Sequence, residues 1–369
     1  MGRTRPSVGL APPAFRKDAR AKKAKTTINK VIPALLSAHP RARKGIDSSE
    51  LITLANLPKE KDAVPGASLN KQNPRITLRV TDTLAAAHSL LATQNSGEPD
   101  LSNRKARVVI LNMASPLSPG GGFLNGASSQ EESLCMRTTL LPSLRDSFYR
   151  LPELGAIYTP DVLVHRDEQG EDLSKSERWF VDCVSAAMLR QPDTDVDSDG
   201  AAVSYANPRD RELIAQKMHF VMNLVQAKGA RSVVLGAWGC GAYSNPVGEV
   251  ATAWKSVLMG SREGGGDKNW HGIEDIVFAI KDKSLAEKFA EYFGDGITRD
   301  DEASNTPSEG GEDLEDTEMG TLSDKIRETK ASMEQAKSPH LKLGLSRVLS
   351  GLEDQLRTQH TQQPASESG

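Results

Sequence analysis

Two adjacent carboxylates follow a run of glycines in the stretch SPGGGFLNGASSQEESLC, which spans residues 118–135. The glycines occupy positions 120–122, and after seven further residues the triplet Gln130, Glu131 and Glu132 follows. One carboxylate beside another raises the pKa of one member, which keeps that member partly protonated near neutral pH. A carboxylic acid in this state can act as a general acid when the bond between a sugar and an oxygen breaks.

A second glycine-rich stretch, GAWGCGAYSNP at residues 236–246, follows the apolar run SVVL. Both glycine stretches lead from a predicted strand to a predicted helix, so we expect their backbone N–H groups at a positive helix end. Glycine also lets the main chain approach a ligand closely. Two such loops facing each other would form a cradle for a diphosphate. A diphosphate cradle beside a glycosidic acid indicates a nucleotide-sugar substrate.

Other kinds of chemistry have less support in the sequence. The chain has no G-x-x-x-x-G-K-[ST] motif, and no G-x-G-x-x-G follows its first strand, which disfavours a Rossmann dehydrogenase. None of the seven histidines forms a pair at metal-ligand spacing, so we expect neither a metal nor a cofactor. Cys240 lies in the second glycine stretch without a marked histidine partner, which disfavours a thiol nucleophile. The three cysteines lack C-x-x-C spacing and are expected to be reduced.

The apolar segments alternate in a way that predicts an α/β fold with a largely parallel sheet. In such sheets ligands bind where strands end in loops, which is where both glycine stretches lie. Asp82 is placed to cap the helix that follows it. Strands are expected at residues 75–80, 106–114, 155–166, 178–189, 231–238 and 273–280. Helices are expected at residues 31–38, 49–57, 83–92, 131–147, 207–229, 245–260 and 284–294.

Both ends of the chain differ in composition from the middle. Residues 1–30 hold nine Lys or Arg and one acid, and we expect a basic disordered tail at 1–25. That tail could be a solvated segment, a nuclear import signal, a weak nonspecific contact to nucleic acid or a mitochondrial presequence. Residues 296–369 are expected to form an acidic, mostly disordered tail with a possible weak helix. No run of about 18 apolar residues exists, so no membrane contact is expected, and the nucleus or cytoplasm is favoured.

The spacing of the GGG and QEE motifs resembles the signature of poly(ADP-ribose) glycohydrolases. The flanking VVILNMASP, SLCMRTTLLPSL and LGAWGCGAYSNP are similar to the microbial-type branch of that family, which occurs in bacteria and filamentous fungi. The resemblance covers residues 26–295, a catalytic domain with an N-terminal helical extension. It implies a macrodomain-like three-layer α/β/α sandwich with a mixed, largely parallel central sheet.

The same resemblance implies an activity and its partners. It implies a metal-free glycosidase that releases ADP-ribose from chain ends, with poly(ADP-ribose) and ADP-ribosylated proteins as partners. A role in reversing ADP-ribosylation during the DNA damage response, and a fungal source, are further implications. Two alternatives stay open, a mono-ADP-ribosyl hydrolase and a non-catalytic macrodomain that binds ADP-ribose.

The resemblance also implies roles for single residues. Glu132 would be the catalytic acid, Glu131 would bind hydroxyls at the scissile link, and Gln130 would hold the loop in shape. Tyr243 would stack on the adenine or the terminal ribose. The full set of implied substrate-binding residues is Gly120, Gly121, Gly122, Phe123, Asn125, Gln130, Gly239, Cys240, Gly241, Ala242 and Tyr243.

Two positions support the resemblance less clearly, one because it differs from the family and one because it has a second explanation. Ser118 stands where the family often has asparagine, and its shorter hydroxyl would anchor the glycine loop more weakly. Asp82 resembles the acidic position that many macrodomains use for adenine, and its role as a helix cap explains it equally well.

Overall fold

The computed structural model of the chain describes residues 13–57, 73–92, 108–196, 203–260 and 270–300. An eight-stranded mixed sheet forms its centre. Six strands pair in parallel, whereas β4 runs antiparallel to both of its neighbours, β1 and β5. In sheet order the strands are β1 (Glu50–Thr53), β4 (Gly155–Val164), β5 (Trp179–Ala186), β3 (Val108–Met113), β8 (Ser232–Leu235), β9 (Asp275–Ala279), β2 (Arg75–Arg79) and β10 (Thr298–Arg299).

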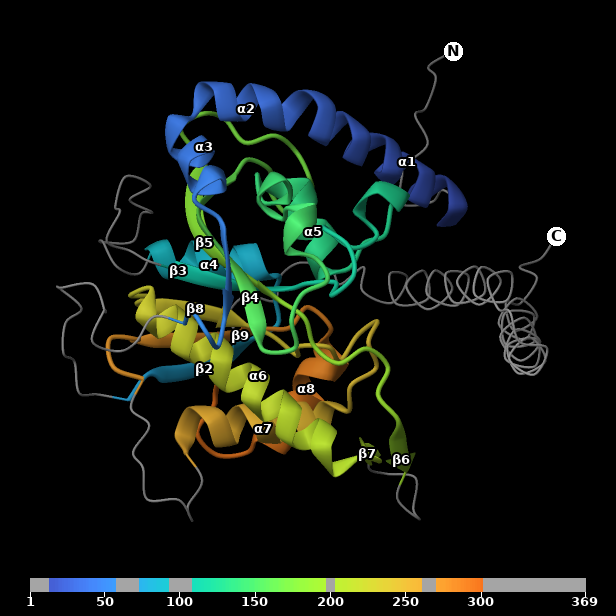
Figure 1. Ribbon diagram of the computed structural model, residues 1–369, viewed down its shortest axis with the longest axis vertical. Coiled ribbons are helices and arrows are strands. Elements are labelled where there is room, and N and C mark those ends of the chain that lie inside the picture. The colour runs from blue at the N-terminus through green and yellow to red at the C-terminus, as the bar shows by residue number, and fades with distance from the viewer. Residues whose placement is uncertain (1–12, 58–72, 93–107, 197–202, 261–269, 301–369) are drawn as a thin grey trace, which may run out of the picture. The chain divides into compact units, whose positions relative to one another are not determined.

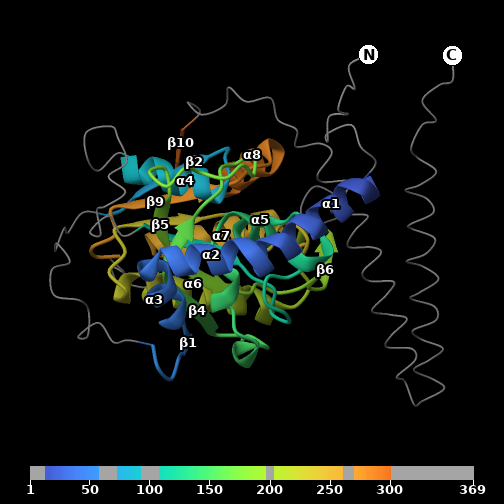
Figure 2. The same cartoon turned by 90° about the horizontal axis from the view of Figure 1, so that it is seen from above.

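Helices cover both faces of this sheet (Figures 1 and 2). Alternate residues of β3 point to opposite sides, so that Val109 and Leu111 enter one core while Val108 and Ile110 enter the other. The first core receives α6 (Pro208–Ala227), α7 (Val247–Met259) and α8 (Lys283–Phe293), and the second receives α1 (Pro13–Thr26), α4 (Thr83–Ala92) and α5 (Gln130–Arg137). The predicted three-layer α/β/α sandwich is therefore confirmed.

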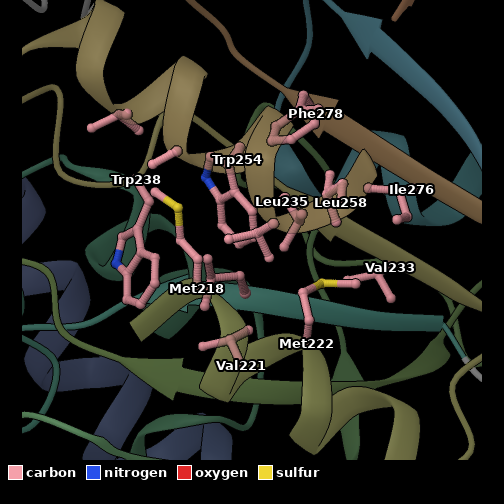
Figure 3. Close-up of a cluster of buried hydrophobic side chains, with 14 of the residues drawn as sticks. Met218, Val221, Met222, Val233, Leu235, Trp238, Trp254, Leu258, Ile276 and Phe278 are labelled. Carbon is pink, nitrogen blue, oxygen red and sulfur yellow. The ribbon is translucent and has the colours of Figure 1, made fainter. Parts of the chain in front are cut away.

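Large apolar side chains fill the first core, as Figure 3 shows. Met218 and Met222 of α6 lie one helical turn apart and face β8 and β9, as their spacing predicts. Trp254 of α7 packs on Trp238, with ring centroids 6.3 Å apart, and edge-on against Phe278. Burying one such side chain stabilises a fold by about 1.5–3 kcal/mol. Trp238 belongs to the second glycine stretch, so this core holds the base of that loop.

Two elements differ from the sequence prediction. Residues 49–57, expected as a helix, contain the edge strand β1, because Ile52 is buried when β1 pairs antiparallel with β4. The helix expected at 131–147 ends at Arg137. Thr138 adopts an extended conformation and pairs with Val164 of β4, which draws the chain out of the helix.

The basic N-terminal segment also differs from its prediction. Residues 13–26, expected to lie almost wholly in a disordered tail, form α1, which continues through the π-helix η2 (Thr27–Val31) into α2 (Ile32–Ala38) and α3 (Pro40–Asp47). Ala24 and Thr27 are buried, so α1 is part of the packed domain. At the other end, β10 extends the sheet beyond the expected boundary at residue 295. Residues 1–12 and 301–369, including the possible weak helix, lie outside the described residues.

Candidate active site

Neighbouring parallel strands bring the two glycine stretches together. β3 and β8 are adjacent in the sheet and parallel, so their C-terminal ends meet at one edge. Residues 114–129, which we call the carboxylate loop, join β3 to α5, and residues 236–246, which we call the amide loop, join β8 to α7. Tyr243 of the amide loop is hydrogen-bonded to the Ser115 side chain of the carboxylate loop. The predicted juxtaposition of the two loops is thus present in the structure.

The glycines of the carboxylate loop make room for the two glutamates. Gly121 has a φ of +55°, and a Cβ atom there would lie 2.8 Å from Glu132 Oε1 and 3.0 Å from Glu131 Oε2. Gly122 donates its N–H to Glu132 Oε1 at 2.8 Å. A side chain at position 121 would therefore be both conformationally strained and in contact with the carboxylates. The glycine run is needed here because the carboxylates fold back onto the backbone.

Gln130 fixes the start of α5 against the sheet. Its Nε2 donates to the Leu111 carbonyl at 2.8 Å and to Thr83 Oγ1 at 3.2 Å, while its Oε1 accepts from the Met113 N–H at 3.0 Å. These three bonds are to β3 and to the start of α4 and not to residues 114–129, so the loop-shaping role expected of Gln130 stays a prediction. They also place Glu131 and Glu132 in the first turn of α5, where the helix dipole favours negative charge.

Glu131 is enclosed by the protein, with 4% of its surface exposed. Its Oε2 accepts from the Ser115 N–H at 2.8 Å, and its Oε1 lies 3.4 Å from Asn112 Nδ2. Burial raises the pKa of Glu131 to about 8, the charge of Glu132 adds to the rise, and the Ser115 N–H acts against it. The neighbouring carboxylate was the expected cause of a raised pKa, whereas burial is the larger one.

Glu132 has one oxygen held and the other without a protein partner. Oε1 accepts from the Gly122 N–H, whereas Oε2 is buried and has no hydrogen bond among the described residues. Burial raises the pKa of Glu132, and the backbone N–H groups of Gly122, Glu132 and Ser129 act against the rise. A protonated Oε2 could donate to a ligand oxygen, which is the geometry a general acid needs.

The amide loop is held by the side chain of Asn245, which is 3% exposed. Its Nδ2 lies within hydrogen-bonding distance of the carbonyls of Leu189 (2.7 Å), Gly239 (3.1 Å) and Tyr243 (3.3 Å). Its Oδ1 accepts from the Tyr205 hydroxyl at 2.8 Å. This single amide thereby joins the loop to the segment that follows β5 and to the strand β7 (Val203–Tyr205), which pairs with β6 (Thr194–Val196).

The two loops orient their backbone N–H groups differently. In the carboxylate loop the N–H of Gly121 donates to the Ser118 carbonyl, and that of Gly122 donates to Glu132. The prediction that both loops present N–H groups to a diphosphate is therefore wrong for these two groups. In the amide loop the N–H groups of residues 241–243 have no protein acceptor among the described residues, so they remain available to an anion.

Other predicted site residues lie in varied surroundings. Gly120 and Phe123 are buried, with Phe123 in the second core beneath the loop, and Asn125 is exposed. Burial raises the pKa of Cys240 to about 12, which disfavours a thiolate there. Gly239 has a φ of +83° and no room for a Cβ, because Asn245 Nδ2 would lie 2.6 Å away.

The remaining members of the amide loop lie nearer the surface. Gly241 is exposed and has open space around it, whereas Ala242 and Tyr243 are half-buried. Burial raises the pKa of Tyr243, against the effect of its hydrogen bond with the Ser115 side chain.

Three residues that build this site were not predicted from the sequence. Asn112 is the one polar residue in an apolar strand, and that interruption could have marked it. Ser115 binds Glu131 through its N–H, and its Oγ accepts from the N–H groups of Leu117 and Ser118. Asn245 lies inside the second glycine stretch and has no feature in the sequence to distinguish it from a helix-start residue.

Ser115 supplies the anchoring of the glycine loop that the short Ser118 side chain was expected to weaken. Ser115 Oγ accepts from the Ser118 N–H, and the Gly121 N–H donates to the Ser118 carbonyl, so the loop has an anchor other than the Ser118 side chain.

Asp82 does cap α4. Its Oδ1 accepts from the N–H groups of Leu84 and Ala85, and the same oxygen pairs with Arg137 at 2.9 Å. The predicted cap is confirmed, and the ion pair joins the start of α4 to the end of α5. Its Oδ2 is buried and has no hydrogen-bond partner among the described residues.

Two kinds of feature are absent from the described ranges. Within them, no helix combines the length and apolar character needed to cross a membrane. The same ranges contain no group of three or more His, Cys, Asp or Glu side chains able to hold a metal ion.

Comparison with known proteins finds one similar family model and several similar solved structures. The family model described as "Microbial-type PARG, catalytic domain" matches residues 44–167, where PARG denotes poly(ADP-ribose) glycohydrolase. The crystal structure of poly(ADP-ribose) glycohydrolase from Thermomonospora curvata is 26% identical with a TM-score of 0.57, covering 75% of this chain and 100% of that one. The same protein bound to the inhibitor ADP-HPD gives a TM-score of 0.55 at 26% identity, with the same coverage.

A second bacterial protein shares the fold. Poly(ADP-ribose) glycohydrolase from Deinococcus radiodurans in complex with ADP-ribose is 22% identical with a TM-score of 0.50, covering 69% of this chain and 97% of that one. No curated protein matches the chain. The matched residues include the whole carboxylate loop and both glutamates, so this part of the chain is similar to the microbial-type PARG catalytic domain.

Proposed function

We propose that this chain is a poly(ADP-ribose) glycohydrolase that releases ADP-ribose from chain ends, with Glu132 as its general acid and base. The observation that carries the proposal is the state of Glu132. One of its oxygens is fixed by the Gly122 N–H, the other is buried without a protein partner among the described residues, and burial raises the pKa of the group. The similar protein from Thermomonospora curvata carries the same activity in its name.

The chemistry would proceed in two proton transfers. Protonated Glu132 gives its proton to the 2′-oxygen of the departing ribose, and the electron pair of the breaking C–O bond goes to that oxygen. The anomeric carbon then has oxocarbenium character. Glu132, now a carboxylate, takes a proton from water as the water oxygen bonds to the anomeric carbon. The acid is thereby restored to its starting state.

Glu131 and the amide loop would hold the substrate in place. The two oxygens of the Glu131 carboxyl group have more lone pairs than the Ser115 N–H uses, so Glu131 can also accept from a ribose hydroxyl. Gly241, Ala242 and Tyr243 would donate their backbone N–H groups to the diphosphate. Tyr243, half-buried at the end of this row, would stack on the adenine or the terminal ribose. The flexible glycines allow this close approach.

The test is ADP-ribose release from purified poly(ADP-ribose) by the wild type, by Glu132→Gln and by Glu287→Gln. The amide at position 132 keeps an acceptor for the Gly122 N–H and loses the proton, so we expect turnover to fall by about 10²–10⁴-fold. Glu287 is exposed on α8, which makes it a matched control expected to retain full activity. Binding of free ADP-ribose should survive in all three proteins.

The alternatives give different outcomes. Binding without release from the polymer, but with release from singly modified protein, would indicate a mono-ADP-ribosyl hydrolase. Binding without release from either substrate would indicate a macrodomain that only binds ADP-ribose. Activity of Glu132→Gln within about tenfold of wild type, equivalent to about 1.4 kcal/mol of barrier, would exclude Glu132 as the acid.

A further inference from the structure

The basic helix α1 lies directly behind the carboxylate loop, and Figure 1 shows it running above α5. Arg20 Nε donates to the Gly126 carbonyl at 2.7 Å. Gly126 has a φ of +77°, and a Cβ atom there would lie only 2.1 Å from the Lys17 carbonyl. The backbones of α1 and of the carboxylate loop therefore touch at Gly126, and this contact holds α1 beside the loop that leads to Glu131 and Glu132.

Positive charge is concentrated on this helix. It carries six basic residues and a single acid, Asp18, although the whole chain has a net charge of −3. Ala24 faces the core, whereas Lys22 and Lys25 are exposed and have no salt bridge among the described residues. The six basic residues lie between positions 16 and 25, a distance of about 14 Å along the helix axis. Lys22 and Lys25 lie about one turn apart, so this helix offers two exposed cations to an anionic ligand.

The proposed substrate carries the opposite charge in a repeating pattern. Every unit of poly(ADP-ribose) contains a diphosphate, and only the terminal unit would occupy the cradle between the two loops. We propose that the exposed basic face of α1 binds the diphosphates of the units that follow the terminal one. This inference rests on the proposed function and deepens it. Contacts with α1 would give the protein a higher affinity for the polymer than for free ADP-ribose.

The test compares polymer binding with binding of the single unit. Lys22→Glu/Lys25→Glu is made in the Glu132→Gln protein, so that the polymer is not consumed during the measurement. The control is Lys283→Glu/Lys288→Glu, the same charge change on exposed residues of α8 in the opposite layer. Circular dichroism of each protein checks that the helices remain formed.

We expect the α1 variant to lose about tenfold in affinity for long poly(ADP-ribose), while its affinity for free ADP-ribose is unchanged. Each lost phosphate contact should flatten the slope of log affinity against log salt by about 0.7, or about 1.4 for two. The α8 control should bind the polymer about tenfold more tightly than the α1 variant.

Three results would overturn the inference. Equal polymer affinity in the α1 and α8 variants would remove α1 from binding. A parallel loss for polymer and free ADP-ribose would indicate a structural effect on the loop. The third result uses a single-stranded DNA with the same number of phosphates. If the α1 variant lost as much affinity for this DNA as for the polymer, and the DNA fully displaced the polymer from the wild-type surface, the surface would be assigned to nucleic acid. Failure of the proposed function is seen separately, because wild-type protein would then release no ADP-ribose whatever the binding data show.

Discussion

The carboxylate loop and the amide loop begin at neighbouring strand ends, contain several glycines and lead into helices, yet their hydrogen bonds are arranged in opposite ways. In the carboxylate loop, side-chain oxygens of Glu131 and Glu132 accept from backbone N–H groups. In the amide loop, the side-chain nitrogen of Asn245 approaches backbone carbonyls, and among the described residues the N–H groups of positions 241–243 have no protein acceptors.

This difference indicates that one loop positions the acids and the other can bind an anion. A loop whose N–H groups are used internally can fix buried acids but has fewer donors for an anion. A loop held by its carbonyls keeps its donors for a ligand. Similar glycine content therefore serves two purposes. Glycine gives space to carboxylates in one loop and exposes main-chain donors in the other.

Among substitutions within the two loops, the largest expected effect comes from alanine at Gly121, compared with alanine at Gly241. A Cβ at Gly121 meets both carboxylates and forces a left-handed residue into strain, so we expect turnover to fall by about 10²-fold or more. A Cβ at Gly241 would have no protein atom within 4 Å, so the folded loop tolerates it, and this variant should lose less turnover than Gly121→Ala. Steady-state kinetics on poly(ADP-ribose) measures both. Equal loss in the two variants would contradict the comparison.

Next in size is Asn245→Ala. It leaves the buried Tyr205 hydroxyl and several loop carbonyls without their partner, so we expect about 2–3 kcal/mol of lost stability. The loosened loop should bind ADP-ribose about tenfold more weakly, or about 1.4 kcal/mol. Urea unfolding and calorimetric titration measure these quantities, with the exposed Asn223→Ala as control. Unchanged ADP-ribose affinity in Asn245→Ala would argue against a binding role for the amide loop.

The third prediction concerns stability against pH. Because burial raises the pKa of Glu131 from 4.5 to about 8, the folded protein binds more protons than the unfolded chain between those values. The contribution to stability is fully present below pH 4.5 and is lost as the pH rises toward 8, by up to about 1.4 kcal/mol per pH unit. Glu131→Gln should flatten this decline. Denaturant unfolding from about pH 5 to about pH 8 checks it, and an unchanged slope would mean that Glu131 is ionised throughout.

The smallest effect is expected for Cys240→Ser in the amide loop. Burial raises the pKa of its thiol to about 12, so little thiolate is present at neutral pH. Turnover should remain within about twofold of wild type, and a thiol reagent should leave the wild type active. Loss of activity by more than about tenfold would reopen a nucleophilic role for this residue.

Much of the scaffold could be predicted from local patterns. The apolar runs of β3, β8 and β9 are buried on both faces, and Met218 and Met222 repeat at helical spacing. The edge strand β1 and the early end of α5 could not be read this way, since both depend on pairing with β4, a contact between distant segments. Helix α1 likewise contacts a distant segment, because Arg20 donates to the Gly126 carbonyl 106 residues away.

The site was predictable in its residue types but not in its hydrogen bonds. Spacing alone indicated that Glu131 and Glu132 start a helix after the glycines. The donation from Gly122 to Glu132 spans ten residues, and the contacts of Asn245 with Leu189 and Tyr205 span 56 and 40. Bonds of that range are set by the tertiary fold, so the direction of the N–H groups in each loop required the structure.

The most direct test of the division between the loops is to measure turnover on poly(ADP-ribose) and the dissociation constant of ADP-ribose for Glu132→Gln and Asn245→Ala side by side. We predict that Glu132→Gln loses turnover by at least about 10²-fold with its ADP-ribose affinity retained, whereas Asn245→Ala loses mainly affinity. If both variants lost turnover and affinity in the same proportion, the two loops would act as one unit and the division would be wrong.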